Sequence, residues 1–169
     1  MKTEVDTQPT AAEEGLPVTF GLKKLLVPIE DAECSGKALQ YAIAFAKQFH
    51  ASITLLNALK IDYVGSEGPI DYARLESELR ANGEKLLEDL VANDVRGQVP
   101  CSVTVEIGSA GASIVEVAKN MEADLIIIST HGRTGFSHFL LGSTTEYVIR
   151  HAPCPVLTVR KHEHDFVTG

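Results

Sequence analysis

Cysteine is scarce in this chain, and the three cysteines do not pair at short spacing. Cys34, Cys101 and Cys154 are far apart and odd in number, with no CxxC pair, which fits reduced thiols better than a disulfide framework or a zinc site. The amino-terminal stretch MKTEVDTQPTAAEEG also lacks the long apolar core of a signal peptide. Together these absences favour reduced thiols and a cytoplasmic location.

An excess of basic residues is also missing. The chain has 23 acidic residues against 15 lysines and arginines, which gives a formal net charge of −8. Nucleic acids and anionic membranes are bound by basic surfaces, so we expect neither as a partner. No apolar run approaches the length of a membrane span. A phosphate ligand would have to be held by local amides and a few nearby side chains, against the overall field.

Two common nucleotide-binding motifs are absent. The pair Gly36-Lys37 lacks both the upstream glycine and the following hydroxyl residue of the G-x-x-x-x-G-K-[ST] motif. No G-x-G-x-x-G fingerprint is present either. The sequence therefore argues against a conventional P-loop ATPase and against an NAD-dependent dehydrogenase.

The length of 169 residues is typical of a single domain with a real core. Residues 1–21 are polar and contain Pro9, Gly15 and Pro17, which predicts a flexible leader. We expect one domain over residues 22–161, followed by a polar tail over 162–169.

Strand and helix patterns alternate along this domain. Short apolar or alternating runs predict strands at 25–27, 52–59, 101–107, 125–128 and 156–159. Helical spacing predicts helices between them, the first capped by Ser35 and the second spanning residues 70–94. Asn82-Gly83 is a hairpin turn signal inside the second helix, but its flanks have helical periodicity.

The order βαβαβαβαβ predicts a single-domain α/β fold, an open sheet of five mainly parallel strands with helices on both faces. The clean alternation from Cys101 to Ile107 indicates a strand at or near an edge of that sheet. Ligands bind such sheets beyond the carboxyl ends of the strands, where the strand order reverses. Three candidate segments lie at such ends: 28–31, 57–59 and 129–132.

A glycine-bearing segment follows the fourth strand. Gly132 and Gly142 are separated by nine residues, and Ser143 comes next. Glycines allow backbone amides to approach a phosphate closely, although they also punctuate turns and helix starts. The sequence Ser143-Thr144-Thr145-Glu146 matches a capping box, which would use the same amides that a phosphate would use. We expect Ser143, Thr144 and Thr145 to contact phosphate when a ligand is present.

With these residues in place, the chain resembles the universal stress protein family from about Lys23 to Arg160. Its nucleotide-binding members carry Gly, two residues, Gly, nine residues, Gly and then Ser or Thr. Gly132, Gly142 and Ser143 fit that pattern, while its first glycine falls on Ser129. The family's aspartate that contacts adenine falls on Glu30.

The resemblance implies a Rossmann-like, adenine-nucleotide-binding domain. It implies ATP or AMP as the ligand, with Mg²⁺ possible alongside ATP, and a homodimer joined through the strand Val156–Val159. The residues that it places at the nucleotide are Pro28, Ile29, Glu30, Ala58, Ile128, Ser129, His131, Gly132, Arg133, Gly142, Ser143, Thr144 and Thr145.

Three roles remain open from the sequence. The first is a sensor or regulator in the stress response, which binds nucleotide and presents the result to an unknown protein partner. The second, motivated by Ser129 and Glu30, is a nucleotide-free scaffold for protein interaction. The third is a slow ATP hydrolase or autophosphorylating enzyme. We predict no catalytic residue, because no Ser or Asp arrangement makes His131 part of a triad. We predict no metal ligand either.

Overall fold

The computed structural model describes residues 19, 21–60, 71–130, 142–160 and 167. Its elements in chain order are β1 (Lys24–Pro28), α1 (Ala32–Phe49), β2 (Ser52–Leu59), α2 (Tyr72–Leu90), the π-helical turn η1 (Val91–Val95), β3 (Cys101–Ile107), α3 (Ala110–Asn120), β4 (Leu125–Ser129), α4 (Ser143–His151) and β5 (Val156–Val159). Most of the predicted leader and polar tail lies outside the described residues.

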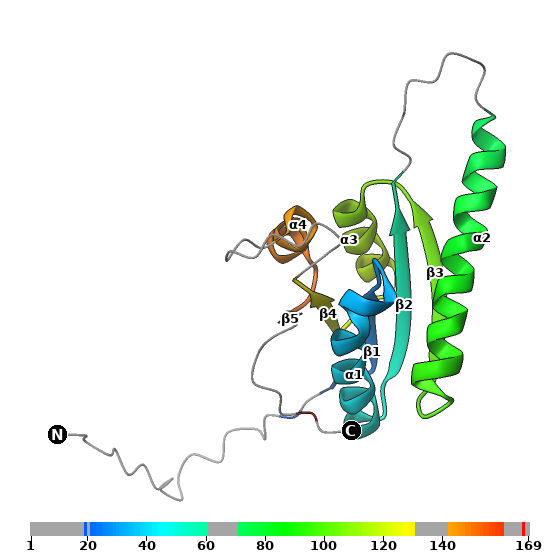
Figure 1. Ribbon diagram of the computed structural model, residues 1–169. Helices are drawn as coiled ribbons and strands as arrows, with labels where there is room; N and C mark the ends of the chain where they lie inside the picture. Colours follow the sequence, from blue (N-terminus) through cyan, green and yellow to red (C-terminus); the bar gives the residue numbers. More distant parts are fainter. Residues whose placement is uncertain (1–18, 20, 61–70, 131–141, 161–166, 168–169) are drawn as a thin grey trace, which may run out of the picture.

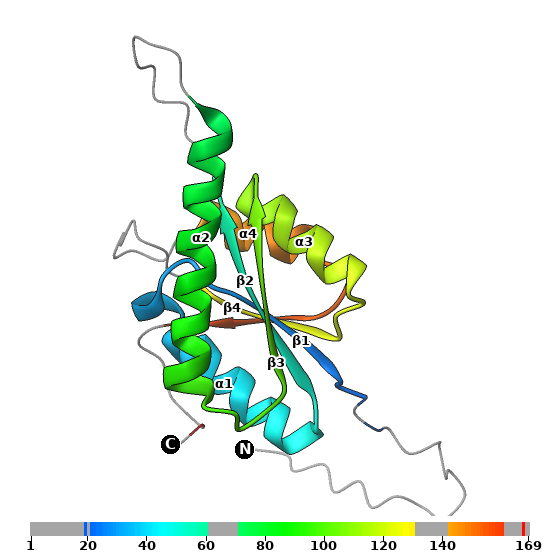
Figure 2. The ribbon, with the colours of Figure 1, turned by 90° about the vertical axis from the view of Figure 1, so that its right-hand side faces the viewer.

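The five strands form one sheet in the order β3-β2-β1-β4-β5 (Figures 1 and 2). Every neighbouring pair is parallel, so the predicted α/β fold is confirmed. The prediction that the strand from Cys101 to Ile107 lies at an edge is also confirmed, because β3 ends the sheet on one side. The strand order reverses between β1 and β4, since the chain first adds β2 and β3 on one side and then β4 and β5 on the other.

Helices cover both faces of the sheet, α1 and α2 on one and α3 and α4 on the other (Figures 1 and 2). Side chains alternate between two buried clusters: Leu25 and Val27 pack toward α1 and α2, whereas Leu26 packs toward α3 and α4. Both faces of the central strands are therefore dry, which explains their continuous apolar runs. None of the helices in the described parts of the chain has the length and apolar character that a membrane span requires.

The glycine of the Asn82-Gly83 pair lies within α2, as its helical surroundings predict. Gly83 is buried against the sheet, and a Cβ on it would lie 3.1 Å from side-chain atoms of Leu59 and Val105. Glycine is unfavourable in a helix interior, so its presence at position 83 needs another reason. That reason is the close packing of the α2 backbone on β2 and β3.

The first predicted helix start is wrong. Helix α1 begins at Ala32, and Ser35 lies within it instead of capping it. The backbone N–H of Ser35 donates to the carbonyl of Asp31 at 3.2 Å, so the helix extends one turn further toward β1 than the serine suggested. The Ser35 side chain is buried and faces the end of β1.

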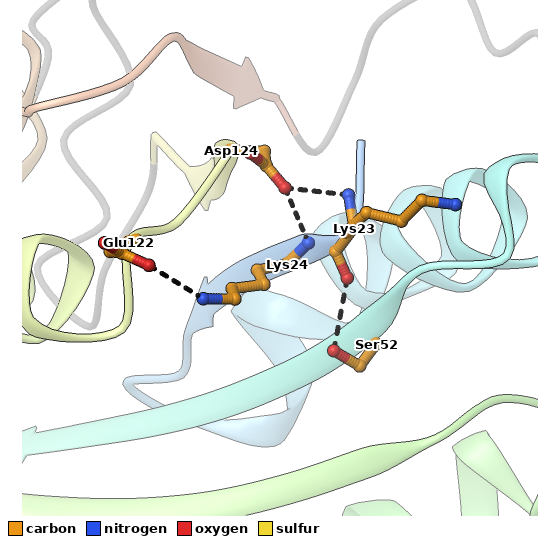
Figure 3. Close-up of polar contacts among 5 residues, drawn as sticks. All are labelled: Lys23, Lys24, Ser52, Glu122 and Asp124. Carbon is orange, nitrogen blue, oxygen red and sulfur yellow. Dashed lines mark hydrogen bonds and ion pairs between the residues drawn. The ribbon is translucent and has the colours of Figure 1, made fainter. Parts of the chain in front are cut away.

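The amino ends of β1, β2 and β4 are tied together by polar contacts (Figure 3). A carboxylate oxygen of Asp124 accepts the backbone N–H groups of Lys23 and Lys24 at 2.7 and 2.8 Å. The hydroxyl and backbone N–H of Ser52 both donate to the carbonyl of Lys23. The ion pair between Lys24 and Glu122 is 3.2 Å long and lies on the surface. These contacts fix the amino end of the sheet. Ligands are expected at the opposite end, beyond the carboxyl ends of the strands.

Candidate functional site

The carboxyl ends of β1 and β4 flank the point where the strand order reverses. The two strands pair only through Leu25 with Leu125 and Leu26 with Ile126. In contrast, β1 pairs with β2 along its whole length, from Lys24 to Pro28. The pairing of β1 with β4 therefore ends at Leu26, two residues before the end of β1. This is the crevice position that doubly wound sheets use for ligands.

The first wall of this crevice is the corner that follows β1. Pro28 ends the strand, and Ile29 is 2% exposed. The N–H of Ile29 donates to the carbonyl of Leu56 at 2.7 Å, which continues the ladder with β2 by one residue. The N–H of Glu30 donates to the hydroxyl of Ser35 at 3.3 Å. The corner is thus fixed on β2 and on α1, while Glu30 itself is exposed at the rim.

Ala58 lies next to this corner on β2. Pro28 pairs with Leu56, two residues before Ala58 on β2. Leu56 packs toward α3 and α4, and Ala58 shares its face of the sheet. Ala58 is half-buried and has a small side chain.

The second wall is built by β4 and the start of α4. Ile128 is buried on the face toward α3 and α4. Ser129 is the last residue of β4 and pairs with Val159 of β5. The hydroxyl of Thr145 donates to the carbonyl of Ser129 at 3.2 Å and is itself buried, so it holds the first turn of α4 against the end of β4.

The serine in place of the first family glycine causes no backbone strain. Glycine is favoured where φ is positive, and the described non-glycine residues with positive φ are His50, Arg96 and Glu122. Ser129 is not among them, because it lies in a regular strand. The departure at this position therefore does not distort the rim.

Helix α4 starts differently from the predicted capping box. Gly142 is its N-cap, with φ −58° and ψ 147°, and Ser143 is already the first helical residue. The carboxylate of Glu146 pairs with Arg150 one turn later, at 2.9 Å. The prediction that Ser143 caps the helix is therefore wrong, since the cap position carries no side chain.

The amides at this helix start are placed to receive an anion. The first intrahelical bond runs from the N–H of Glu146 to the carbonyl of Gly142, at 2.9 Å. The N–H groups of Ser143, Thr144 and Thr145 precede that bond, so the helix offers them no acceptor. They stand at the positive end of the helix dipole, beside the end of β4.

His131, Gly132 and Arg133 lie outside the described residues. Their predicted contacts to phosphate stay predictions, as does the role of Gly132 in the glycine pattern. In the described part of the chain, no group of three or more His, Cys, Asp and Glu side chains is arranged to hold a metal ion.

Two residues have roles that sequence reasoning missed. Ser35 was predicted as a helix cap but holds the backbone of Glu30. Asn57 lies in a predicted rim segment but was given no role, although its buried side chain donates to the carbonyl of Ile29 at 2.7 Å. The sequence signal for Asn57 is a single amide inside the apolar run SITLLNAL.

An open parallel sheet with the strand order β3-β2-β1-β4-β5, and with the start of α4 beside its strand reversal, defines a doubly wound α/β domain. The chain belongs to the universal stress protein family, whose model matches residues 21–160. The resemblance to this family, predicted from about Lys23 to Arg160, is thereby confirmed.

Individual relatives agree with this assignment. A universal stress protein of Methanocaldococcus jannaschii is 31% identical over 140 residues, which cover 82% of this chain and 82% of that protein. The solved universal stress protein UspA from Lactobacillus plantarum has a TM-score of 0.71 at 23% identity, covering 84% of this chain and 100% of the other. The fold predicted from the sequence is therefore that of solved family members.

Some solved proteins of this fold carry an adenine nucleotide. A universal stress protein family protein from Arabidopsis thaliana was solved with AMP bound; it has a TM-score of 0.61 at 20% identity, covering 83% of this chain and 92% of the other. Two further universal stress proteins of the same fold were solved in complex with cAMP and, for the one from Archaeoglobus fulgidus, with dAMP.

Proposed function

We propose that this chain binds an adenine nucleotide, AMP or ATP, in the crevice between β1 and β4. The N-terminal amides of α4 would hold the phosphate, with the hydroxyl of Ser143 as a further donor. Glu30 and Ala58 would receive the ribose and the adenine on the other wall. The AMP, dAMP and cAMP complexes of proteins with this fold support the choice of ligand.

The observation that carries this proposal is the glycine at the cap of α4. The φ of Gly142 is −58°, which any residue adopts, so the backbone does not require a glycine. A Cβ at this position would lie 3.8 Å from the nearest described atom, the carbonyl oxygen of Thr130, which is an ordinary contact. Neither its conformation nor packing against the described residues explains the missing side chain at Gly142. Close approach of a phosphate to the backbone does.

The charge of the chain shapes this binding. With a net charge of −8 the protein repels anions at long range, so the nucleotide must be held by short-range donors. ATP carries more negative charge than AMP, and Mg²⁺ bound to its phosphates would reduce that repulsion. We expect such a Mg²⁺ ion to be coordinated mainly by phosphate oxygens and water.

We infer a role as a sensor or regulator from where the nucleotide would sit. Phosphate at α4 and adenosine at β1 would contact both sides of the crevice, from Glu30 to Gly142. A partner protein that touches this rim would then distinguish the occupied state from the empty one.

Isothermal titration of the purified protein with AMP, ATP and ATP with Mg²⁺ tests the binding. The expected result is saturable heat with at least one of them, and loss of that heat in Gly132→Val, whose branched side chain would occupy the phosphate approach. Native mass spectrometry of protein taken directly from purification would detect nucleotide carried through. Absence of both heat and carried ligand would refute the proposal and favour the nucleotide-free scaffold.

We also propose that two copies of the chain pair through β5. The carbonyls of Pro155 and Val159 accept N–H groups from β4, which places alternate residues of β5 toward β4. The main-chain groups of Val156 and Thr158 therefore point toward the open side of the described sheet. An apolar strand with such an edge favours addition of another strand, and two-fold pairing with its own copy satisfies both edges.

A further inference from the structure

A buried amide lies directly behind the corner that follows β1. Asn57, near the end of β2, is 2% exposed. Its side-chain nitrogen donates to the carbonyl of Ile29 at 2.7 Å. The N–H of Ile29 donates to the carbonyl of Leu56, and the N–H of Glu30 donates to the hydroxyl of Ser35. Three successive polar groups of this corner are thus tied to the fold, and Asn57 is the donor to the carbonyl among the described residues.

The other end of the Asn57 amide faces bare helix backbone. Its side-chain oxygen is buried and has no hydrogen-bond partner among the described residues. A Cβ on Gly83 of α2 would lie only 2.7 Å from that oxygen. A Cα hydrogen of Gly83 takes that position instead, since glycine has no side chain. Any larger residue at 83 would push the amide away from its present orientation.

This arrangement is costly for the fold. Glycine in a helix interior is less favourable than alanine, and a buried acceptor without a partner is less favourable than an apolar group. A leucine at 57 opposite an alanine at 83 would avoid both penalties but would leave the carbonyl of Ile29 without a donor. What the amide and the glycine achieve together is the placement of the Ile29–Glu30 corner, which borders the crevice. Features that break local rules in this way concentrate at functional sites.

We propose that Asn57 is a positioning residue for the nucleotide site. It holds the Ile29–Glu30 corner on β2 so that the Glu30 carboxylate meets the ribose or adenine, and the bare backbone at Gly83 keeps the amide oriented. This inference rests on the proposed function, because the placement of Glu30 matters only if a nucleotide occupies the crevice.

A double-mutant cycle with Asn57→Leu and Glu30→Ala separates positioning from general stability. AMP affinity, measured by isothermal titration well below the unfolding temperature, should fall about tenfold in Asn57→Leu, because the corner loses its tie. In the Glu30→Ala background the same substitution should lower the affinity less than about twofold, since the group that Asn57 positions is already gone. An equal loss in both backgrounds would overturn the proposal, because Asn57 would then not act through Glu30.

Gly83→Ala tests the same idea with the amide intact, and it remains informative if Asn57→Leu does not fold. The new methyl group must displace the Asn57 amide, so AMP affinity should fall although alanine is the better helix former. Gly36→Ala in α1 is the matched control, because a Cβ there meets no described atom within 4 Å. Unchanged affinity in Gly83→Ala would contradict the positioning role. A wild-type protein that binds neither AMP nor ATP would instead refute the proposed function itself.

Discussion

Gly142 is a residue where folding and binding make opposite demands. Serine is a favourable N-cap, and its hydroxyl would accept one of the amide hydrogens at the start of α4. We therefore expect Gly142→Ser to leave the free energy of unfolding unchanged or to raise it by a few tenths of a kcal/mol. The same hydroxyl would compete with phosphate for the amides, so AMP affinity should fall by about tenfold.

Chemical denaturation and isothermal titration of the same preparation measure the two effects together. Gly21→Ser is a suitable control, because a Cβ at Gly21 meets no described atom within 4 Å and the residue lies before β1. If Gly142→Ser bound AMP as tightly as the wild type, the amides of α4 would not be the phosphate site.

The thiols of Cys101 and Cys154 are less acidic than ordinary cysteine thiols. Burial raises the pKa of Cys101. Burial, and secondly the negative charge of Asp124, raise the pKa of Cys154. The thiolate is the reactive form, so at about pH 8 both residues should be alkylated more slowly in the folded protein than in the chain unfolded by urea. Peptide mapping by mass spectrometry reads each cysteine separately; equal rates in both states would show that the fold does not protect them.

Asp124 joins strands at the amino end of the sheet, far from the crevice (Figure 3). Asp124→Ala removes the acceptor of two backbone N–H groups, so we expect the free energy of unfolding to fall by about 1–3 kcal/mol. The affinity for AMP should remain within about twofold, because the substitution leaves the carboxyl ends of β1 and β4 intact. Urea denaturation and titration with AMP measure the two quantities.

Glu122→Gln is the matched control for Asp124→Ala. It removes the charge of a surface ion pair whose carboxylate side chain is 86% exposed, and such pairs contribute about 0–1 kcal/mol. A similar loss of stability in both variants would mean that charge, and not the two backbone hydrogen bonds, holds this end of the sheet.

At the level of whole elements, strands were easier to predict than helix starts. The bounds of β2, β3 and β5 coincide with the predicted runs, because their apolar or alternating residues report directly on a sheet that is buried between helices. The starts of α1 and α4 were misplaced because serines at 35 and 143 satisfy a local capping pattern, whereas the observed helices begin earlier. A helix start depends on where the preceding strand ends and how the chain turns after it. Local sequence patterns do not carry this information.

The whole molecule explains which parts of the site were predictable. The rule that parallel strands end at a common rim correctly placed the carboxyl ends of β1 and β4 side by side, as the strand order shows. The contact between Asn57 and the Ile29 carbonyl was not predictable in the same way. This contact depends on the register of β1 against β2 and on the distance between α2 and the sheet. Both follow from the packing of the whole domain and not from any single sequence motif.

The proposed dimer makes a prediction that depends on the register of β5. The N–H of Thr158 points away from β4, so Thr158→Pro removes a donor on the open side and keeps the bonds between β4 and β5. We expect the measured mass to shift from dimer to monomer in size-exclusion chromatography with light scattering, while the circular dichroism stays that of the wild type. Thr158→Val retains the N–H and should remain dimeric. A dimeric Thr158→Pro protein would place the interface elsewhere, and a monomeric wild type would remove the proposal, because both β5 edges would then stay unpaired in solution.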